Sequence, residues 1–305
     1  QVQGRTYIET GLADAGVMAP FNSSEFPKEI RNVGIALSTD HNPLHGLINP
    51  YLSGINAVVE AMRNVASVGA TPHAITDCLC YGNPEKPEQM WQFVEGVRGI
   101  NDACKTITLK HSIGSPTPII AGNVSFYNES KDRPIPPSPI ISCLGRIQDV
   151  KKAITMSFKR ENSSIILIGK RKNELGGSIF YDLHNELGKN IPTPDLNEVK
   201  NQIYGITDCI EKGLVFACHD ISEGGVAASL CEMTFGNSIG CSVNIESKLS
   251  TEKTLFSETG GFILETKNEN IESIHSIFNQ YKLEAYVIGI TGSNKIKLNN
   301  AINIT

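Results

Sequence analysis

Apolar residues follow two alternating spacings along this chain of 305 residues. Short apolar runs typical of buried strands are followed by segments in which apolar side chains recur every three or four positions, the period of a helix. The segment 54–69 shows the helical period well, and Gly69 ends it. Because strands and helices alternate in both halves, the sequence predicts two α/β-type sandwich domains, a number that fits roughly 100–200 residues per domain.

The predicted elements divide at a polar stretch near 148–162, which places the two domains at 1–150 and 151–305. Residues 1–25 and 41–50 are rich in small, polar or turn-forming residues and are interpreted as connections. The predicted strands are 30–39, 73–77, 118–121, 139–147, 164–169 and 215–219. The predicted helices are 54–69, 87–106, 196–213 and 224–235, and two or three strands and one helix are expected after residue 235.

Composition and charge exclude several classes of protein. Hydrophobic residues make up 40% and charged residues 19%, as in a folded globular protein. A net charge of -5 without a Lys/Arg run argues against a nucleic-acid partner. No apolar run approaches the roughly 20 residues that span a bilayer, and residues 1–6 do not resemble a signal peptide, so we expect no membrane association. The chain opens on Gln1, which suggests a fragment or a processed form.

The sequence also lacks the common short motifs of metal and nucleotide sites. The eight cysteines include no C-x-x-C pair, so we interpret them as free thiols in a reducing, cytoplasmic location. The patterns G-x-x-x-x-G-K-[ST], G-x-S-x-G and H-E-x-x-H are absent from the sequence. Their absence argues against a P-loop protein, an α/β-hydrolase and a zinc protease.

Two segments place polar groups where a strand end or a helix face could present them to a ligand. Asp40 follows the apolar run 30–39, and a carboxylate at that end of a strand can point into a ligand crevice. Glu60 and Asn64 are four positions apart on one helix face and could together ligate a hard cation such as Mg²⁺. Each feature has a plainer interpretation, Asp40 as the cap of a turn and the helical pair as a solvated helix edge.

Two further segments combine glycine with polar side chains. Asp77 and Gly122-Asn123 are interpreted as strand ends entering turns, where backbone N–H groups could approach phosphate while Asp and Asn oxygens hold Mg²⁺. In the run 219–225 a helix begins directly after a strand, so its N-terminus could bind an anion, with Ser222 as the N-cap. The alternatives are two tight turns and an ordinary helix cap. Taken together, the four segments suit Mg²⁺–phosphate chemistry.

Five strings of residues resemble one enzyme family: TDCLCYGNPEKPEQMW, AGNVSFYNES, HDISEGG, ALSTDHN and NAVVEAMRN. They resemble the small form of phosphoribosylformylglycinamidine synthase and occur in the order of that family's second half. The resemblance covers nearly the whole chain. It implies an α+β fold of the aminoimidazole-ribonucleotide-synthetase type, in which an N-terminal domain supplies half of a shared barrel and an α+β C-terminal domain follows.

The resemblance also implies a reaction and partners. Such an enzyme converts formylglycinamide ribonucleotide, ATP and ammonia to formylglycinamidine ribonucleotide, ADP and phosphate, with Mg²⁺ as cofactor. Ammonia comes from a separate glutaminase subunit, which assembles with a small bridging subunit. The family's catalytic His and most substrate contacts lie in the first half of the synthetase. We therefore expect no catalytic residue in this chain and no activity from it alone.

By the same resemblance, two sets of residues match family sites. The first set is Asp77 and Gly122 for ATP, Asn123 for Mg²⁺ and Ser125 for substrate. The second set matches an auxiliary nucleotide site between the two domains, with Asp40, Glu60, Asn64 and Asp220 as Mg²⁺ ligands and Ser222 against the nucleotide. Two alternatives stay open: a non-catalytic half that holds nucleotide and docks partner subunits, or another member of the same ATP-dependent superfamily, such as a selenophosphate synthetase or a thiamine-monophosphate kinase.

Overall fold

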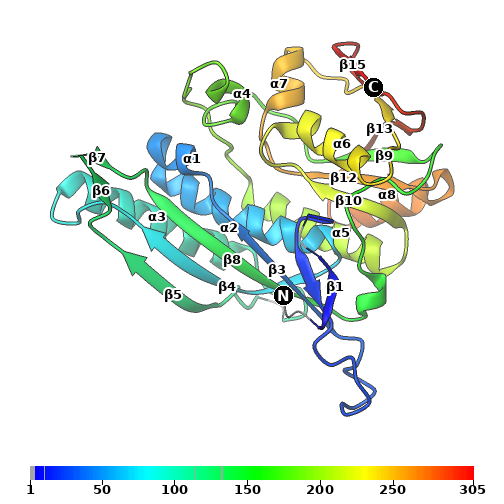
Figure 1. Ribbon diagram of the computed structural model, residues 1–305, viewed down its shortest axis with the longest axis horizontal. Helices are drawn as coiled ribbons and strands as arrows, with labels where there is room; N and C mark the ends of the chain where they lie inside the picture. The colour runs from blue at the N-terminus through cyan, green and yellow to red at the C-terminus, as the bar shows by residue number, and fades with distance from the viewer. Residues whose placement is uncertain (1–3, 10, 113, 132) are drawn as a thin grey trace.

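The computed structural model of this chain describes residues 4–9, 11–112, 114–131 and 133–305. It contains a six-stranded sheet from the first half, a seven-stranded sheet from the second half and a small two-stranded hairpin. Figure 1 shows the two halves side by side, with helices α2 (Pro50–Ser67) and α5 (Leu196–Glu211) between the two large sheets. Because α2 contacts strands of both sheets, it belongs to both halves of the structure.

The first sheet has the strand order β1-β2-β3-β8-β4-β5. Strand β4 pairs in parallel with the edge strand β5 and antiparallel with β8. The other elements of this half are β1 (Thr6–Ile8), β2 (Gly16–Met18), β3 (Gly34–Asp40), α1 (Pro43–Ile48), β4 (Thr71–Cys80), α3 (Pro87–Thr106), β5 (Ile119–Ser125), β6 (Glu129–Ser130), β7 (Arg133–Pro134) and β8 (Ser138–Ile147).

The second sheet has the order β10-β12-β9-β13-β11-β14-β15. Its half contains η1 (Val150–Lys152), β9 (Ser164–Ile168), α4 (Ile179–Asp182), β10 (Val215–Asp220), α6 (Gly225–Phe235), β11 (Cys241–Val243), α7 (Thr251–Phe256), β12 (Phe262–Thr266), η2 (Asn268–Asn270), α8 (Ile271–Gln280), β13 (Ala285–Thr291), β14 (Ile296–Leu298) and β15 (Ile302–Ile304). In the part of the chain that the structure describes, no helix is both long and apolar enough to cross a membrane.

Helix α2 carries most of the second predicted set, and its sequence explains its position. Asn49 caps the helix by accepting a hydrogen bond from the backbone N–H of Leu52 at 3.0 Å, and Pro50 suits the first turn. Nearly all of its side chains are buried, since it packs against the first sheet, α3 and α5. Gly54 allows close contact with α3, because a Cβ there would lie 2.3 Å from the carbonyl oxygen of Gly96.

Helices cover one face of the first sheet, and the other face is open to solvent (Figure 1). Burial alternates along β3 and β8, as expected when only one face is covered. Leu37 on the open face of β3 is 55% exposed, and β5 is exposed along almost all of its length, including Ile120 and Val124. A sheet edge with exposed apolar side chains is a surface on which another chain segment can pack.

The structure departs from the predicted elements mainly in the first half. Residues 43–48 were expected to be part of a connection, but they form α1, because Asn42 accepts hydrogen bonds from the backbone N–H groups of Leu44 and His45. The described part of the predicted loop 1–25 includes β1 and β2. The second half also holds more strands and helices after α6 than expected.

The long elements agree well with the sequence. The helix predicted at 87–106 has those bounds in the structure. The strand predicted at 139–147 begins one residue earlier, and those predicted at 164–169 and 215–219 differ by one residue at their ends. A strong apolar pattern was therefore enough to predict the bounds of these elements, with the Pro at the first turn as a further signal for the helix.

Candidate functional site

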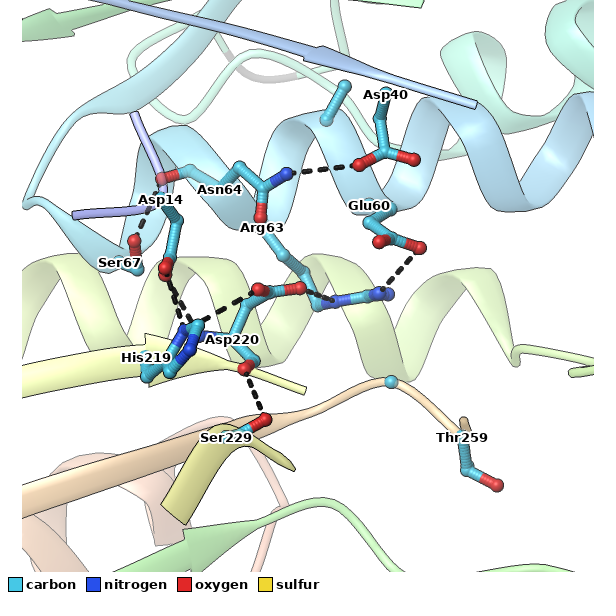
Figure 2. A network of polar contacts seen from close by, with 12 residues as sticks. Asp14, Asp40, Glu60, Arg63, Asn64, Ser67, His219, Asp220, Ser229 and Thr259 are labelled. Carbon is cyan, nitrogen blue, oxygen red and sulfur yellow. Dashed lines mark hydrogen bonds and ion pairs between the residues drawn. The ribbon is translucent and has the colours of Figure 1, made fainter. Parts of the chain in front are cut away.

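The second predicted set of residues meets between the two halves (Figure 2). Asp40 ends β3, Asp220 ends β10, and α2 contributes Glu60 and Asn64. Asn64 Nδ2 donates a hydrogen bond to Asp40 Oδ2 at 3.2 Å. The structure thus brings together all four predicted metal ligands, and with Arg63 we refer to them as the interdomain cluster.

Arg63, which was not predicted as a site residue, lies inside this cluster. Its Nη2 is 3.6 Å from Glu60 Oε2, and its Nε is 3.5 Å from Asp220 Oδ2. The Arg63 side chain is only 4% exposed, so it pairs with carboxylates of both halves away from solvent. The available sequence signal was its position three residues after Glu60, on the same helix face.

Burial raises the pKa values of the three carboxyl groups in the cluster. The pKa of Asp40 is raised to about 7, first by burial and then by the charge of Glu223. The pKa of Asp220 is raised to about 8 by burial and then by the charge of Asp14. Burial, followed by the charge of Asp40, also raises the pKa of Glu60 well above its usual value. A nearby cation favours the charged forms of such groups.

Three buried oxygens of the cluster have no hydrogen-bond partner among the described residues: Glu60 Oε1, Asn64 Oδ1 and Asp220 Oδ2. Buried polar atoms are normally paired, so these three are exceptions. Carboxylate and amide oxygens are the ligands that hard divalent cations such as Mg²⁺ prefer. The donor set therefore fits the predicted cation.

A buried histidine beside the cluster is held between acidic side chains (Figure 2). His219 Nδ1 lies 2.7 Å from Asp14 Oδ1, and Nε2 lies 2.8 Å from Glu232 Oε2. Burial alone would lower the pKa of His219, but the charge of Asp14 and its hydrogen bond outweigh burial and raise this pKa well above its usual value. Asp14 Oδ2 also accepts from the backbone N–H of Asp220 at 2.9 Å. Asp14 thus ties the N-terminal segment to β10.

Asp14, His219 and Asp220 are close enough together to hold a metal ion. Both ring nitrogens of His219 instead face carboxylates, which suits an imidazolium that donates two hydrogen bonds. Asp14 gave no sequence signal, because it lies in a segment without periodicity. His219 belongs to the predicted 219–225 segment, although no role was assigned to it.

Ser222 lines a cleft beside the interdomain cluster, but the prediction that it caps helix α6 is wrong. The N-cap is Gly224, whose φ of 76° lies in the left-handed region that favours glycine. Glu258 Oε1 accepts from the backbone N–H of Gly224 at 2.9 Å and from that of Ile179 at 2.8 Å. A side-chain carboxylate of this chain therefore already contacts the helix end that was predicted to bind an external anion.

The first predicted set lies on the neighbouring strands β4 and β5. Asp77 is opposite Gly122, and Ser125 is opposite Cys80. A Cβ at position 122 would lie 2.8 Å from Asp77 Oδ1, so a glycine leaves room for the carboxylate. Burial raises the pKa of Asp77, while a hydrogen bond from the backbone of Asn123 acts in the opposite direction. The two strands run on to Cys80 and Ser125, so the strand predicted to end at Asp77 is three residues longer and the turn predicted at Gly122-Asn123 is wrong.

The pairing also separates this set onto two faces of the sheet. Adjacent residues of a strand point to opposite faces, so Asp77 and Gly122 belong to the helix-covered face and Asn123 and Ser125 to the open face. Asn123 Nδ2 lies 3.6 Å from Cys78 Sγ, which in turn lies 3.9 Å from Cys80 Sγ. The structure does not bring the Asp77 carboxylate and the Asn123 amide onto the same face.

One row of residues across the sheet connects the two predicted sets. Asp40 on β3 and Asp77 on β4 both pair with Ile141 of β8, so all three lie side by side. Adjacent strands are about 4.8 Å apart, which puts the backbones of the two aspartates about 10 Å from each other. Strand β8 lies between β3 and β4, so Asp40 of the second set and Asp77 of the first set are near each other across this strand.

Two-domain architecture and an acidic cluster at the domain boundary define the class of this chain. Residues 13–147 match the family described as AIR synthase related protein, N-terminal domain, and residues 160–298 match AIR synthase related protein, C-terminal domain. The two matches together cover most of the chain, which therefore belongs to the AIR synthase related family. The fold class predicted from the sequence is confirmed.

The chain has curated relatives that are PurL subunits. The chain is 42% identical over 301 residues to phosphoribosylformylglycinamidine synthase subunit PurL of Methanothrix thermoacetophila, a match that covers 98% of this chain and 38% of that relative. The chain thus spans less than half the length of the curated relative. The resemblance to this synthase, inferred from the five sequence strings, is confirmed.

Solved structures of T. maritima PurL share the fold. The complex with FGAR superimposes with a TM-score of 0.74 at 19% identity and covers 89% of this chain and 45% of that one. The complex with ATP has a TM-score of 0.69 at 19% identity and covers 90% of this chain and 43% of that one. At this identity, the likeness establishes the fold.

Proposed function

We propose that this chain is the C-terminal half of an ATP-dependent carbon–nitrogen ligase of purine biosynthesis. The whole enzyme converts formylglycinamide ribonucleotide and ammonia to formylglycinamidine ribonucleotide, with ATP cleaved to ADP and phosphate. The observation that carries this proposal is the 42% identity along 98% of the chain to a PurL subunit of which it spans 38%. The domain boundary is proposed between residues 150 and 151.

The proposed cofactors are ATP and Mg²⁺, in line with the ATP complex of T. maritima PurL. When bound, ATP would supply the phosphoryl group that activates the substrate amide oxygen. Asp77 and Gly122 are proposed to contact ATP, Asn123 to hold Mg²⁺ and Ser125 to contact the substrate. The interdomain cluster, with Ser222 beside it, would hold a second Mg²⁺–nucleotide, because its unpaired buried oxygens suit a hard cation.

The proposed partners would cover the exposed sheet face of this chain and supply the groups that it lacks. The first half of the same synthetase would cover the open face of the first sheet, where Leu37 and β5 are exposed. That half would supply the catalytic His, and so this chain contributes no catalytic residue of its own. A glutaminase subunit would deliver ammonia, with a small bridging subunit in the same cytoplasmic complex.

A second candidate function is a structural half that holds nucleotide and docks partner subunits. One observation favours it: the interdomain cluster is built entirely from residues of this chain, whereas the Asp77 and Asn123 side chains face opposite sides of a sheet edge. The two candidates differ in which set of residues the reaction needs.

The test combines this chain with the remaining half of the synthetase. Purified residues 1–305 alone should give no formylglycinamidine ribonucleotide from ATP, ammonia and substrate, and addition of the separately purified first half should restore turnover. Turnover by the chain alone would contradict the composite site. Restored turnover that survives both Asp77→Ala and Asn123→Ala would favour the structural role.

A further inference from the structure

We infer that the guanidinium of Arg63 is the resident cation of the interdomain cluster, and that a divalent cation enters this cluster only in competition with it. The inference deepens the cation site proposed above. It depends on the geometry of the cluster and not on the synthetase reaction.

The position of Arg63 is that of a bridging cation. It pairs with Glu60 on its own helix at 3.6 Å and with Asp220 of the second half at 3.5 Å. The Arg63 charge also acts on Asp40, since it opposes the rise of the Asp40 pKa that burial causes. With the side chain 4% exposed, solvent screens these attractions little. One positive group therefore holds acidic side chains of both halves together.

The backbone around Arg63 is shaped to admit its guanidinium. A Cβ on Gly260 would lie 2.3 Å from Arg63 Nη1 and 2.5 Å from Arg63 Cζ. Any side chain at position 260 would therefore displace the guanidinium. Arg171 fixes this stretch of backbone by donating to the carbonyl oxygen of Gly260 at 3.0 Å. The glycine at position 260 therefore leaves the space that the Arg63 guanidinium occupies.

The ion pairs of Arg63 leave ligand atoms available. Charge-assisted hydrogen bonds between nitrogen and oxygen are usually about 2.7–2.9 Å long, and both Arg63 contacts are longer. Over the residues that the structure describes, Arg63 Nε, Glu60 Oε1 and Asp220 Oδ2 make no hydrogen bond. Arg63 thus balances charge without saturating the oxygens, which a smaller cation could still ligate.

Two cations in this small buried volume would repel each other. Like charges about 4 Å apart away from bulk water repel each other strongly. The cluster therefore accepts either Arg63 or a divalent ion near Glu60 and Asp220. Removal of the Arg63 charge should turn a weak divalent-cation site into a tight one.

The experiment measures Mn²⁺ binding to the 305-residue chain by electron paramagnetic resonance, without nucleotide, substrate or partner. Arg63→Met should bind Mn²⁺ on the order of tenfold more tightly than wild type, or better still. The matched control is Arg98→Met, since Arg98 pairs with Glu95 at the same i,i+3 spacing but is 61% exposed. Arg98→Met should bind as wild type does.

A second substitution assigns the bound ion to the cluster. The added Mn²⁺ site should disappear in Arg63→Met/Asp220→Asn and persist in Arg63→Met/Asn123→Ala. Equal or weaker Mn²⁺ binding by Arg63→Met would overturn the inference, as would a tight, Asp220-dependent Mn²⁺ site in wild type.

Should Arg63→Met fail to fold, two proteins that retain the charge decide the matter. The Tm of wild type should be the same in chelator as in millimolar Mg²⁺. The Tm of Arg63→Lys should likewise not change between these two conditions. A rise in wild-type Tm with Mg²⁺ that Asp220→Asn abolishes would refute resident occupancy by Arg63. Since no turnover is measured, failure here leaves the proposed synthetase function standing, and the reverse also holds.

Discussion

The interdomain cluster and the β4–β5 edge contain similar acidic and amide side chains in opposite surroundings. In the cluster, Asn64 and Asp220 are buried, the Glu60 side chain is only 12% exposed, and Arg63 from this chain balances the charge of the acids. At the edge, Asn123 is exposed, and no described arginine or lysine pairs with Asp77. A buried group of acids must carry its own counter-charge, whereas an exposed edge can leave that charge to a ligand or to another half.

Removal of Arg63 should have the largest effect and would test the buried side of this comparison. Arg63→Ala leaves Glu60 and Asp220 buried without their cation, so in metal-free buffer we expect the free energy of unfolding to fall by about 3–5 kcal/mol. Urea denaturation measures this loss. Arg98→Ala, at the exposed Glu95 pair, should cost no more than about 1 kcal/mol. Equal losses in the two variants would mean that burial is not what distinguishes the cluster.

At the edge, substitutions should affect turnover instead of stability. In the complete synthetase, Asp77→Ala or Asn123→Ala should lower kcat/KM by about 10²–10³-fold, the usual effect of losing electrostatic help to a transferring group. Steady-state kinetics measure the change, with exposed His73→Ala on the same strand as the control. Near-wild-type kinetics for both variants would place the reaction elsewhere.

Nucleotide binding tests whether the interdomain cluster also takes up an external ligand. If the cluster holds Mg–ADP, a ligand concentration of 100 times Kd should add about 2.7 kcal/mol to the free energy of unfolding. Thermal unfolding with and without Mg–ADP reports this gain. Asp220→Asn should reduce the gain more than it reduces kcat in the complete synthetase. No shift in either protein would show that the cluster does not take up this nucleotide.

The change per pH unit is smaller than the effects above, and it concerns the buried surroundings of α1. Burial, and then the charge of His41, lower the pKa of His45 to about 4 from 6.5. The unfolded chain takes up this proton near pH 6.5, whereas the folded chain resists until about pH 4. Stability should therefore decrease by roughly 1.4 kcal/mol per pH unit as pH falls through this window.

Urea denaturation of wild type and His45→Gln across this pH range measures the His45 contribution. The variant should lose that part of the pH slope, whereas His73→Gln at an exposed strand position should keep it. Identical slopes in wild type and His45→Gln would indicate that water reaches the His45 ring.

The elements with strong periodicity could be predicted from the sequence, and those whose pattern is weak or depends on neighbours could not. Helix α3 was predicted with its bounds because Pro87 and the helical period agree. Helix α1 has only six residues and depends on the Asn42 cap. Strand β5 is an exposed edge without apolar alternation, so Gly122 and Asn123 suggested a turn. These residues are in a strand because they pair with β4, which local sequence does not show.

The residues of the cluster were easier to predict than its charge balance. Local pattern drew attention to Asp40 at a strand end and to Glu60 with Asn64 on a helix face, each with a plainer alternative, and only the family resemblance joined them with Asp220 as one set of ligands. The role of Arg63 depends on how the second half packs on α2, and a charged helix residue is usually solvated. Asp14 was missed for the same reason, since its partner His219 lies far along the chain.

The contact between Asp14 and β10 also has a consequence for how the chain is made. The Asp14 carboxylate accepts from a backbone group 206 residues further along, so it has no native partner until that strand has left the ribosome. During translation the strands of the first sheet can pair over α2 before the Asp14 segment has its partners on β10. The segment around Asp14 is thus made long before the strand on which it docks, and a ribosome that stops before Asp220 leaves the Asp14 carboxylate without its partners on β10.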